Sequence, residues 1–264
     1  MTMAEARTLI QTAHLPSAQA FAADAPESGG GLPSFDAARD QALVVGSDVV
    51  SFTTGVEAEF RQAITDSSLF SQLVAIHKVG DDADPMAFFN AYFETLLGLG
   101  WIEQQRETAA ISLDSGGFDV HQAVIGVIST FLAPVAGPAA LVAVVAVLNG
   151  LHQINADQPF ITLFDKRTRH GRIGRFQITS VRHDPAQGLM AEVMAFALVA
   201  DEVITQVLFF KLHKGSTELR RSFGSLSVDA QALAGIRPNL AAKVGAFRTA
   251  FIAEADLGSV PGGK

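Results

Sequence analysis

The most distinctive pattern in the chain is a long apolar stretch without charge. From Val120 to Ala156 there is no Asp, Glu, Lys or Arg. An apolar run longer than about 18 residues is typical of a transmembrane helix. Here Pro134, Gly137 and Pro138 interrupt the run, and proline removes a helical hydrogen bond. We therefore expect a helical hairpin whose arms have about 14 residues, or roughly 21 Å at 1.5 Å per residue.

Such arms are too short to cross a bilayer core of about 30 Å alone. The second arm is mostly Ala and Val, and small side chains allow close packing between backbones. No Trp, Tyr, Lys or Arg flanks the stretch closely, as membrane anchors would. Burial against a sheet is the favoured placement. The alternatives are a hairpin that is exposed on contact with a membrane or partner, and a constitutive membrane segment.

The segment before this stretch shows apolar residues at three- and four-residue spacing, which predicts helices. The predicted helix starts are the capping box from Thr54 to Glu57, the cap Asp66, and the cap and first-turn proline Asp84–Pro85. The first helix should end near Ile64, and the third at Gly98 or Gly100.

Runs of alternating or β-branched residues predict strands. The predicted strands cover residues 44–52, 101–113, 160–164, 173–181, 189–200, 203–213 and 217–228. The last one is more polar, so we expect it at a sheet edge. A closing helix should follow from Asp229 to about Ala255. The fold class is then α+β, in which N-terminal helices and a buried apolar helical hairpin pack on a C-terminal antiparallel meander sheet with a closing C-terminal helix.

The composition divides the chain into two parts. Residues 1–42 are rich in Ala, Ser, Gly and Pro and predict a flexible low-complexity tail. Residues 43–264 predict a single α+β domain, mainly helical over 43–156 and mainly β over 157–264. The N-terminus has no convincing signal peptide, so we expect a soluble protein, cytoplasmic or exported by a non-classical route. The absence of cysteine excludes disulfides, thiolate zinc sites and cysteine nucleophiles.

Charge is unevenly distributed along the chain. The net charge is −8, with the acidic excess in the first half and a mild basic excess after residue 156. Opposite charges on the two halves can attract each other within one molecule or between copies. A homo-oligomer is therefore an alternative to simple intramolecular complementarity.

The densest basic cluster lies just after the apolar stretch. Its members are Lys166, Arg167, Arg169, His170, Arg172 and Arg175. Arginines in a glycine-containing loop can bind phosphate, carboxylate or anionic lipid headgroups. No aromatic residue alternates with them, so we expect no sequence-specific nucleic-acid partner. The alternative is a solvated loop that faces the acidic half.

Two histidines flank the apolar stretch. His121 and His152 are candidate pH triggers because imidazole gains charge near pH 6. The alternative is that both are ordinary packing residues. The histidines show no metal-ligand spacing, and a turn followed by a helix cap explains the acidic residues at 81–84. We therefore predict no metal or cofactor.

No motif in the chain specifies a reaction. The nucleophile elbow, the phosphate-binding loop and the dinucleotide fingerprint are absent from the sequence, so an enzyme is the weaker hypothesis. The favoured one is a non-enzymatic protein that acts through membrane or protein contact, in its most specific form an effector-like or membrane-active protein with a sequestered hairpin. The alternatives are an assembly subunit that forms homo-oligomers, and an enzyme with a pocket between sheet and helices.

Overall fold

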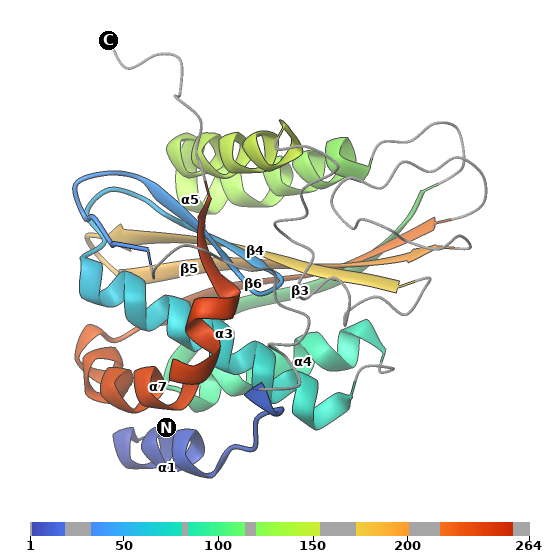
Figure 1. Cartoon of the computed structure of the whole chain (residues 1–264). Coiled ribbons are helices and arrows are strands. Elements are labelled where there is room, and N and C mark those ends of the chain that lie inside the picture. The colour runs from blue at the N-terminus through green and yellow to red at the C-terminus, as the bar shows by residue number, and fades with distance from the viewer. Residues whose placement is uncertain are drawn as a thin grey trace.

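The protein has three layers, a central sheet with helices on both faces (Figure 1). The computed structural model describes residues 2–18, 33–80, 84–113, 120–153, 173–200 and 217–255. The described helices are α1 (Met3–Thr12), α3 (Ala58–Val79), α4 (Pro85–Gly98), α5 (Val120–Gln153) and α7 (Ala230–Phe251). The helix α5 covers one face of the sheet, and the other helices cover the opposite face. This confirms the α+β prediction with a C-terminal helix.

In the described part of the chain, the sheet has seven strands in the order β3-β6-β5-β4-β2-β1-β7. They are β1 (Gln41–Val45), β2 (Asp48–Phe52), β3 (Trp101–Leu113), β4 (Ile173–Asp184), β5 (Gly188–Ala200), β6 (Thr217–Val228) and β7 (Ile252–Ala255). The neighbours β4, β5 and β6 form the predicted antiparallel meander. The pair β2 and β4 is parallel, so the sheet is mixed. The predicted strands at 160–164 and 203–213 lie outside the described residues.

The prediction of an edge position for residues 217–228 is wrong. These residues form β6, which lies between β3 and β5. The polarity of β6 has a different cause, because its arginines form ion pairs above and below the sheet. Arg220 contacts Asp84 at 3.4 Å, and Arg221 contacts Glu107 at 3.2 Å.

The run predicted as one extended segment, residues 44–52, folds back on itself. It contributes to the hairpin of β1 and β2, in which Val45 pairs with Asp48. Gly46 has a φ of 60°, the left-handed conformation that a tight turn requires and that glycine adopts without steric cost.

The two helices predicted from Thr54 and Asp66 are one helix, α3. Its N-cap is Glu57, and Thr54 instead donates from its backbone N–H and hydroxyl to the Asp40 carboxylate, at 2.7 and 2.8 Å. Asp66 lies inside the helix, fully buried, with its carboxylate 3.0 Å from Arg248 of α7. The residue resembles a helix cap in sequence but serves as an ion-pair partner between two helices.

The other predicted cap, Asp84, is confirmed. The Asp84 carboxylate accepts a hydrogen bond from the backbone N–H of Met86, with Pro85 in the first turn of α4. Asp229 caps α7 by accepting from Ala232 at 2.8 Å. Both carboxylates satisfy N–H groups that lack a partner within the helix.

Alternate residues of each strand point to opposite faces, so the sheet separates two apolar clusters. Phenylalanines from α3, α4 and α7 pack with Val50, Phe52 and Val193 on one face. The opposite face contacts α5 through Val49, Ile178 and their neighbours.

The N-terminal helix α1 packs against α7 on the first of these faces. Its residues Ala6 and Ile10 are buried, and Arg7 donates to the carbonyl of Gly235 at 3.0 Å. Part of the segment expected as a tail is therefore a packed helix, while the domain division at residue 42 stays a prediction.

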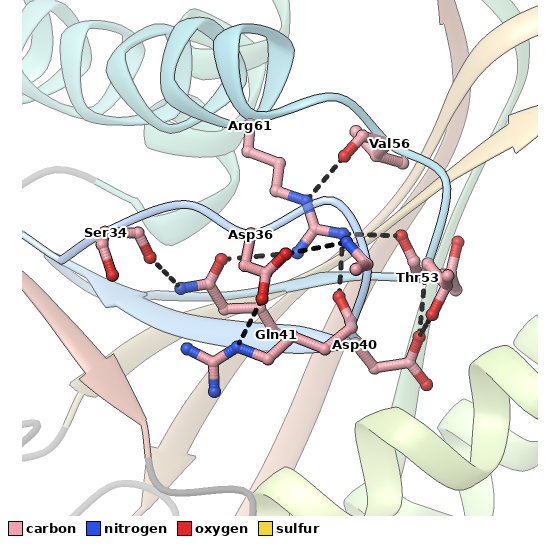
Figure 2. A network of polar contacts seen from close by, with 10 residues as sticks. Ser34, Asp36, Asp40, Gln41, Thr53, Val56 and Arg61 are labelled. Carbon is pink, nitrogen blue, oxygen red and sulfur yellow. Dashed lines mark hydrogen bonds and ion pairs between the residues drawn. The ribbon is translucent and has the colours of Figure 1, made fainter.

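A buried arginine joins the segment before β1 to the start of α3 (Figure 2). The guanidinium of Arg61 donates to the carbonyls of Val56, Arg39 and Thr53 at 2.8 to 3.0 Å, and to the Gln41 side chain at 3.3 Å. Its side chain is fully buried and also lies over the Phe52 ring. The planar fork of arginine suits several carbonyl acceptors at once.

Candidate functional site

The described part of the apolar stretch forms α5 (Val120–Gln153), which breaks at Gly137. This residue has φ 82° and ψ 170°, and helical geometry resumes at Pro138. The two helical segments have about 17 and about 16 residues, or roughly 25 Å each at 1.5 Å per residue. The non-helical residue Gly137 lies between Pro134 and Pro138, and the hairpin itself stays a prediction. Within the described residues, no helix combines the length and apolar character that crossing a membrane requires.

The inner face of α5 is apolar in both segments. Val124, Ile128 and Leu132 recur every four residues in the first segment and are fully buried, as are Val144 and Val147 in the second. The sheet side chains that pack against them are Phe176, Ile178, Met194, Phe196, Leu198, Leu219 and Phe223. Apolar packing of this kind is non-directional.

The outer face of α5 carries no charge. Its exposed residues are Gln122, Gly126, Thr130, Pro134, Val135, Pro138, Val142 and Asn149. Val142 is 58% exposed and Val135 is 36% exposed. We call this surface the uncharged face of α5.

One sheet arginine holds the turn of α5. Arg182 donates from Nη2 to the backbone carbonyl of Val135 at 3.0 Å and from Nη1 to Asp184 at 2.7 Å. Its Nη2 also lies 3.6 Å from the carboxylate of Glu192, which is completely buried under α5. Burial raises the pKa of Glu192, and the nearby Ser225 and Arg182 oppose this shift.

A second sheet arginine contacts the first segment of α5. The guanidinium carbon of Arg221 lies 3.8 Å from the centre of the Phe131 ring, a close cation–π contact. Phe131 also packs on Phe223 of β6, with ring centres 5.7 Å apart. The polar groups of the sheet thus meet α5 at two places, the turn and the Phe131 side chain.

Comparison with known proteins does not assign this chain to a family. No protein-family model and no curated protein matches it. Among solved structures, a delta-endotoxin matches with a TM-score of 0.36 and 11% identity, over 70% of this chain and 84% of that one. The activated Cyt2Ba monomer from Bacillus thuringiensis subsp. israelensis matches with a TM-score of 0.34 and 14% identity, over 69% of this chain and 98% of that one. Neither similarity is close enough to assign an activity.

Most of the predicted basic cluster lies outside the described residues, namely Lys166, Arg167, Arg169, His170 and Arg172. Arg175 is described and lies in β4 with 3% of its surface exposed. Its guanidinium is 4.5 Å from the centre of the Phe88 ring of α4. Arg175 is therefore buried between sheet and helix, and anion binding by the other five residues stays a prediction.

The backbones of His121 and His152 lie in the first and last turns of α5. Their side chains lie outside the described part of the structure. The pH-trigger hypothesis for these two residues therefore stays a prediction.

Sequence reasoning missed a buried carboxylate beneath α3. Asp48 of β2 is completely buried and accepts hydrogen bonds from Ser68 at 2.7 Å and Thr179 at 2.9 Å. The Tyr92 hydroxyl lies 3.4 Å from that of Ser68. Burial raises the pKa of Asp48 to about 6. A lone Asp in an apolar strand was the only sequence signal, and its complete burial points to a structural role.

The structure also contains a cavity of about 500 Å³ near the starts of α3 and α7. Its lining includes Glu57, Phe60, His183 and Asp229. The carboxylate of Asp229 already accepts the capping hydrogen bond of α7. This cavity is the feature on which the enzyme hypothesis would depend, but its ionisable residues are not arranged as an acid–base pair with a shared hydrogen bond among the described contacts.

Proposed function

We propose that this protein acts on membranes by moving α5 from the sheet onto a lipid surface. The observation that carries the proposal is that α5 has no charged residue along its length and packs on an apolar sheet face. A charge-free helix of this length at a protein surface is unusual, because exposed helix faces normally carry charged residues. A lipid surface provides a partner that suits both the uncharged face and the inner face.

The free energy of apolar burial favours the packed position of α5 on the sheet in water, and it permits α5 to separate from the sheet on lipid. Separating α5 from the sheet in water would expose apolar surface at about 25 cal/mol per Å². In hydrocarbon this cost largely disappears, because lipid tails are as apolar as leucine side chains. The movement would uncover apolar sheet residues such as Phe176 and Phe196, together with the polar side chains of Arg182, Glu192 and Arg221.

The geometry of α5 favours a shallow position in the membrane. Two segments of roughly 25 Å are each shorter than a bilayer core of about 30 Å. Backbone hydrogen bonds within each segment satisfy the polar groups of the main chain in lipid. The turn around Gly137 and the two ends of α5 have backbone groups without a partner within the helix, and these can remain at the polar interface.

A covalent lock between α5 and the sheet tests this proposal. The chain has no cysteine, so two introduced thiols are unique. Phe131→Cys with Phe223→Cys places them where the native rings are 5.7 Å apart, within reach of a bis-maleimide linker that contains a reducible disulfide. Release of dye from anionic vesicles should disappear after cross-linking and return after reduction. Undiminished release from the fully cross-linked protein would contradict the proposal.

A matched control locks the opposite helical layer. Glu59 of α3 and Arg237 of α7 form an exposed ion pair at 2.6 Å. Glu59→Cys with Arg237→Cys, cross-linked in the same way, should leave dye release unchanged. Circular dichroism before and after reduction checks that each variant keeps its fold.

A further inference from the structure

Two histidines from distant parts of the chain meet on the helical side of the molecule. His14 follows the end of α1, and His77 lies in the last turn of α3. Their ring centres are 5.7 Å apart and their planes are inclined by 34°. Both side chains are exposed. Sequence spacing gave no indication of this pair, because 62 residues separate its members.

The separation of the two rings suits a shared metal ion. Metal–nitrogen bonds of about 2.0–2.1 Å place two imidazole centres about 5.2 Å apart on a tetrahedral ion, given about 1.1 Å from ring centre to nitrogen. The observed 5.7 Å is therefore within about half an ångström of the distance that coordination requires. Rotation about the side-chain bonds of two exposed residues can supply this small change.

The local electrostatics also favour a cation. The C-terminal ends of α1 and α3 both lie beside the pair, with Ala13 and Gly80 as their C-caps. A helix C-terminus carries a partial negative charge from its free carbonyl groups. Lys78, the cation next to His77, forms an ion pair with Glu94 of α4, which offsets its repulsion of a bound metal ion.

We propose that His14 and His77 bind one divalent transition-metal ion, of the class of Cu²⁺, Ni²⁺ or Zn²⁺, and that this ion clamps α1 to α3. Imidazole is a preferred ligand for these ions, whereas Ca²⁺ and Mg²⁺ prefer oxygen. Among the described residues there is no group of three or more His, Asp or Glu side chains arranged to hold a metal. Water or an external ligand therefore completes the coordination, and the ion exchanges readily.

The clamp has a direct consequence for the N-terminal helix. Because α1 otherwise contacts mainly α7 and, less, α4, the ion adds a link between α1 and α3. The site is independent of the proposed movement of α5, which lies on the other face of the sheet (Figure 1).

Titration calorimetry with the full chain, free of any added histidine tag, tests the site with CuCl₂ and ZnCl₂ separately at pH 7.5. We expect tighter binding of Cu²⁺ than of Zn²⁺, and loss of one metal equivalent in both His14→Ala and His77→Ala. The exposed His183 lies elsewhere, so His183→Ala should keep that equivalent. Saturating metal should raise the melting temperature of the unsubstituted chain but not of the two pair variants.

Two results would overturn the inference. One is metal stoichiometry and affinity in His14→Ala and His77→Ala equal to those of the unsubstituted chain, which would leave the pair as two rings in contact without a metal. The other is a partial loss of metal binding in one variant with unchanged binding in the other. A site with two ligands needs both histidines, so each variant should lose it. Since both residues are exposed, alanine variants should fold, and circular dichroism without metal checks this directly.

Discussion

The Nη2 atom of Arg182 lies 3.0 Å from the backbone carbonyl oxygen of Val135 and 3.6 Å from the carboxylate of Glu192. One guanidinium therefore connects the turn of α5 to a carboxylate buried beneath it. This relationship makes Arg182 the residue whose loss should loosen α5 most directly.

Arg182→Ala should destabilise the fold by about 3–5 kcal/mol, because it leaves a buried charge without its partner. Glu192→Gln in the same background should recover part of that loss, since the neutral amide costs less to bury. Urea unfolding of the two single variants and the double variant measures the coupling. Additive effects would show that the two side chains do not interact.

Gly137→Ala should destabilise α5, by about 1–3 kcal/mol, because its φ of 82° disfavours any side chain. A Cβ there would meet nothing within 4 Å, so the cost is purely conformational. Gly126→Ala is the matched control, since it lies inside the helix with equally open surroundings. It should stabilise the protein by about 0.5–1 kcal/mol. Thermal melts of both variants check this, because the melting temperature should fall in Gly137→Ala and rise in Gly126→Ala.

Stability should increase on mild acidification through Asp48. Its pKa of about 6 in the fold exceeds its ordinary value of 3.8, so the folded state binds the proton more tightly. Protonated Asp48 contributes its full stabilisation below about pH 4, and this stabilisation is lost as the pH rises through 6. The free energy of unfolding should therefore differ by about 3 kcal/mol between the two limits.

Asp48→Asn should remove this part of the pH dependence, measured by urea unfolding between pH 4 and pH 7.5. Some dependence should remain, because burial also raises the pKa of Asp66 to about 6 and raises that of Glu192. An unchanged difference in unfolding free energy between pH 4 and pH 7.5 would show that Asp48 titrates normally.

Two arginines should contribute very differently to the free energy of unfolding. Arg61→Ala removes four donated hydrogen bonds, and those to the Val56 carbonyl and the Gln41 side chain are buried. A buried acceptor left without its donor costs about 1–3 kcal/mol. Arg237→Ala removes an exposed ion pair with Glu59 and should cost under about 1 kcal/mol. Equal losses of unfolding free energy in the two variants would contradict the role assigned to Arg61.

The sequence predicted features that depend on local chemistry. The strand from Trp101 to Leu113 and the helix start at Asp84–Pro85 follow from alternation and capping, and the structure has both. The turn in the apolar stretch follows from the special conformations of proline and glycine.

Features that depend on distant partners were not predictable in this way. The parallel pairing of β2 with β4 joins residues about 130 positions apart. The roles of Asp66 and Asp48 depend on Arg248 and Thr179, and the pairing of His14 with His77 depends on how α1 docks. No periodicity in a single segment contains this information.

The separation of the two apolar clusters by the sheet affects how the molecule unfolds. Side chains on alternate positions of the same strands belong to different clusters, so removing α5 leaves the packing of α3, α4 and α7 intact. The protein should therefore have a sub-global opening in which one layer detaches as a cooperative unit at lower free energy than complete unfolding. Its thermodynamic stability and its readiness to open are then set by different sets of residues and can vary independently.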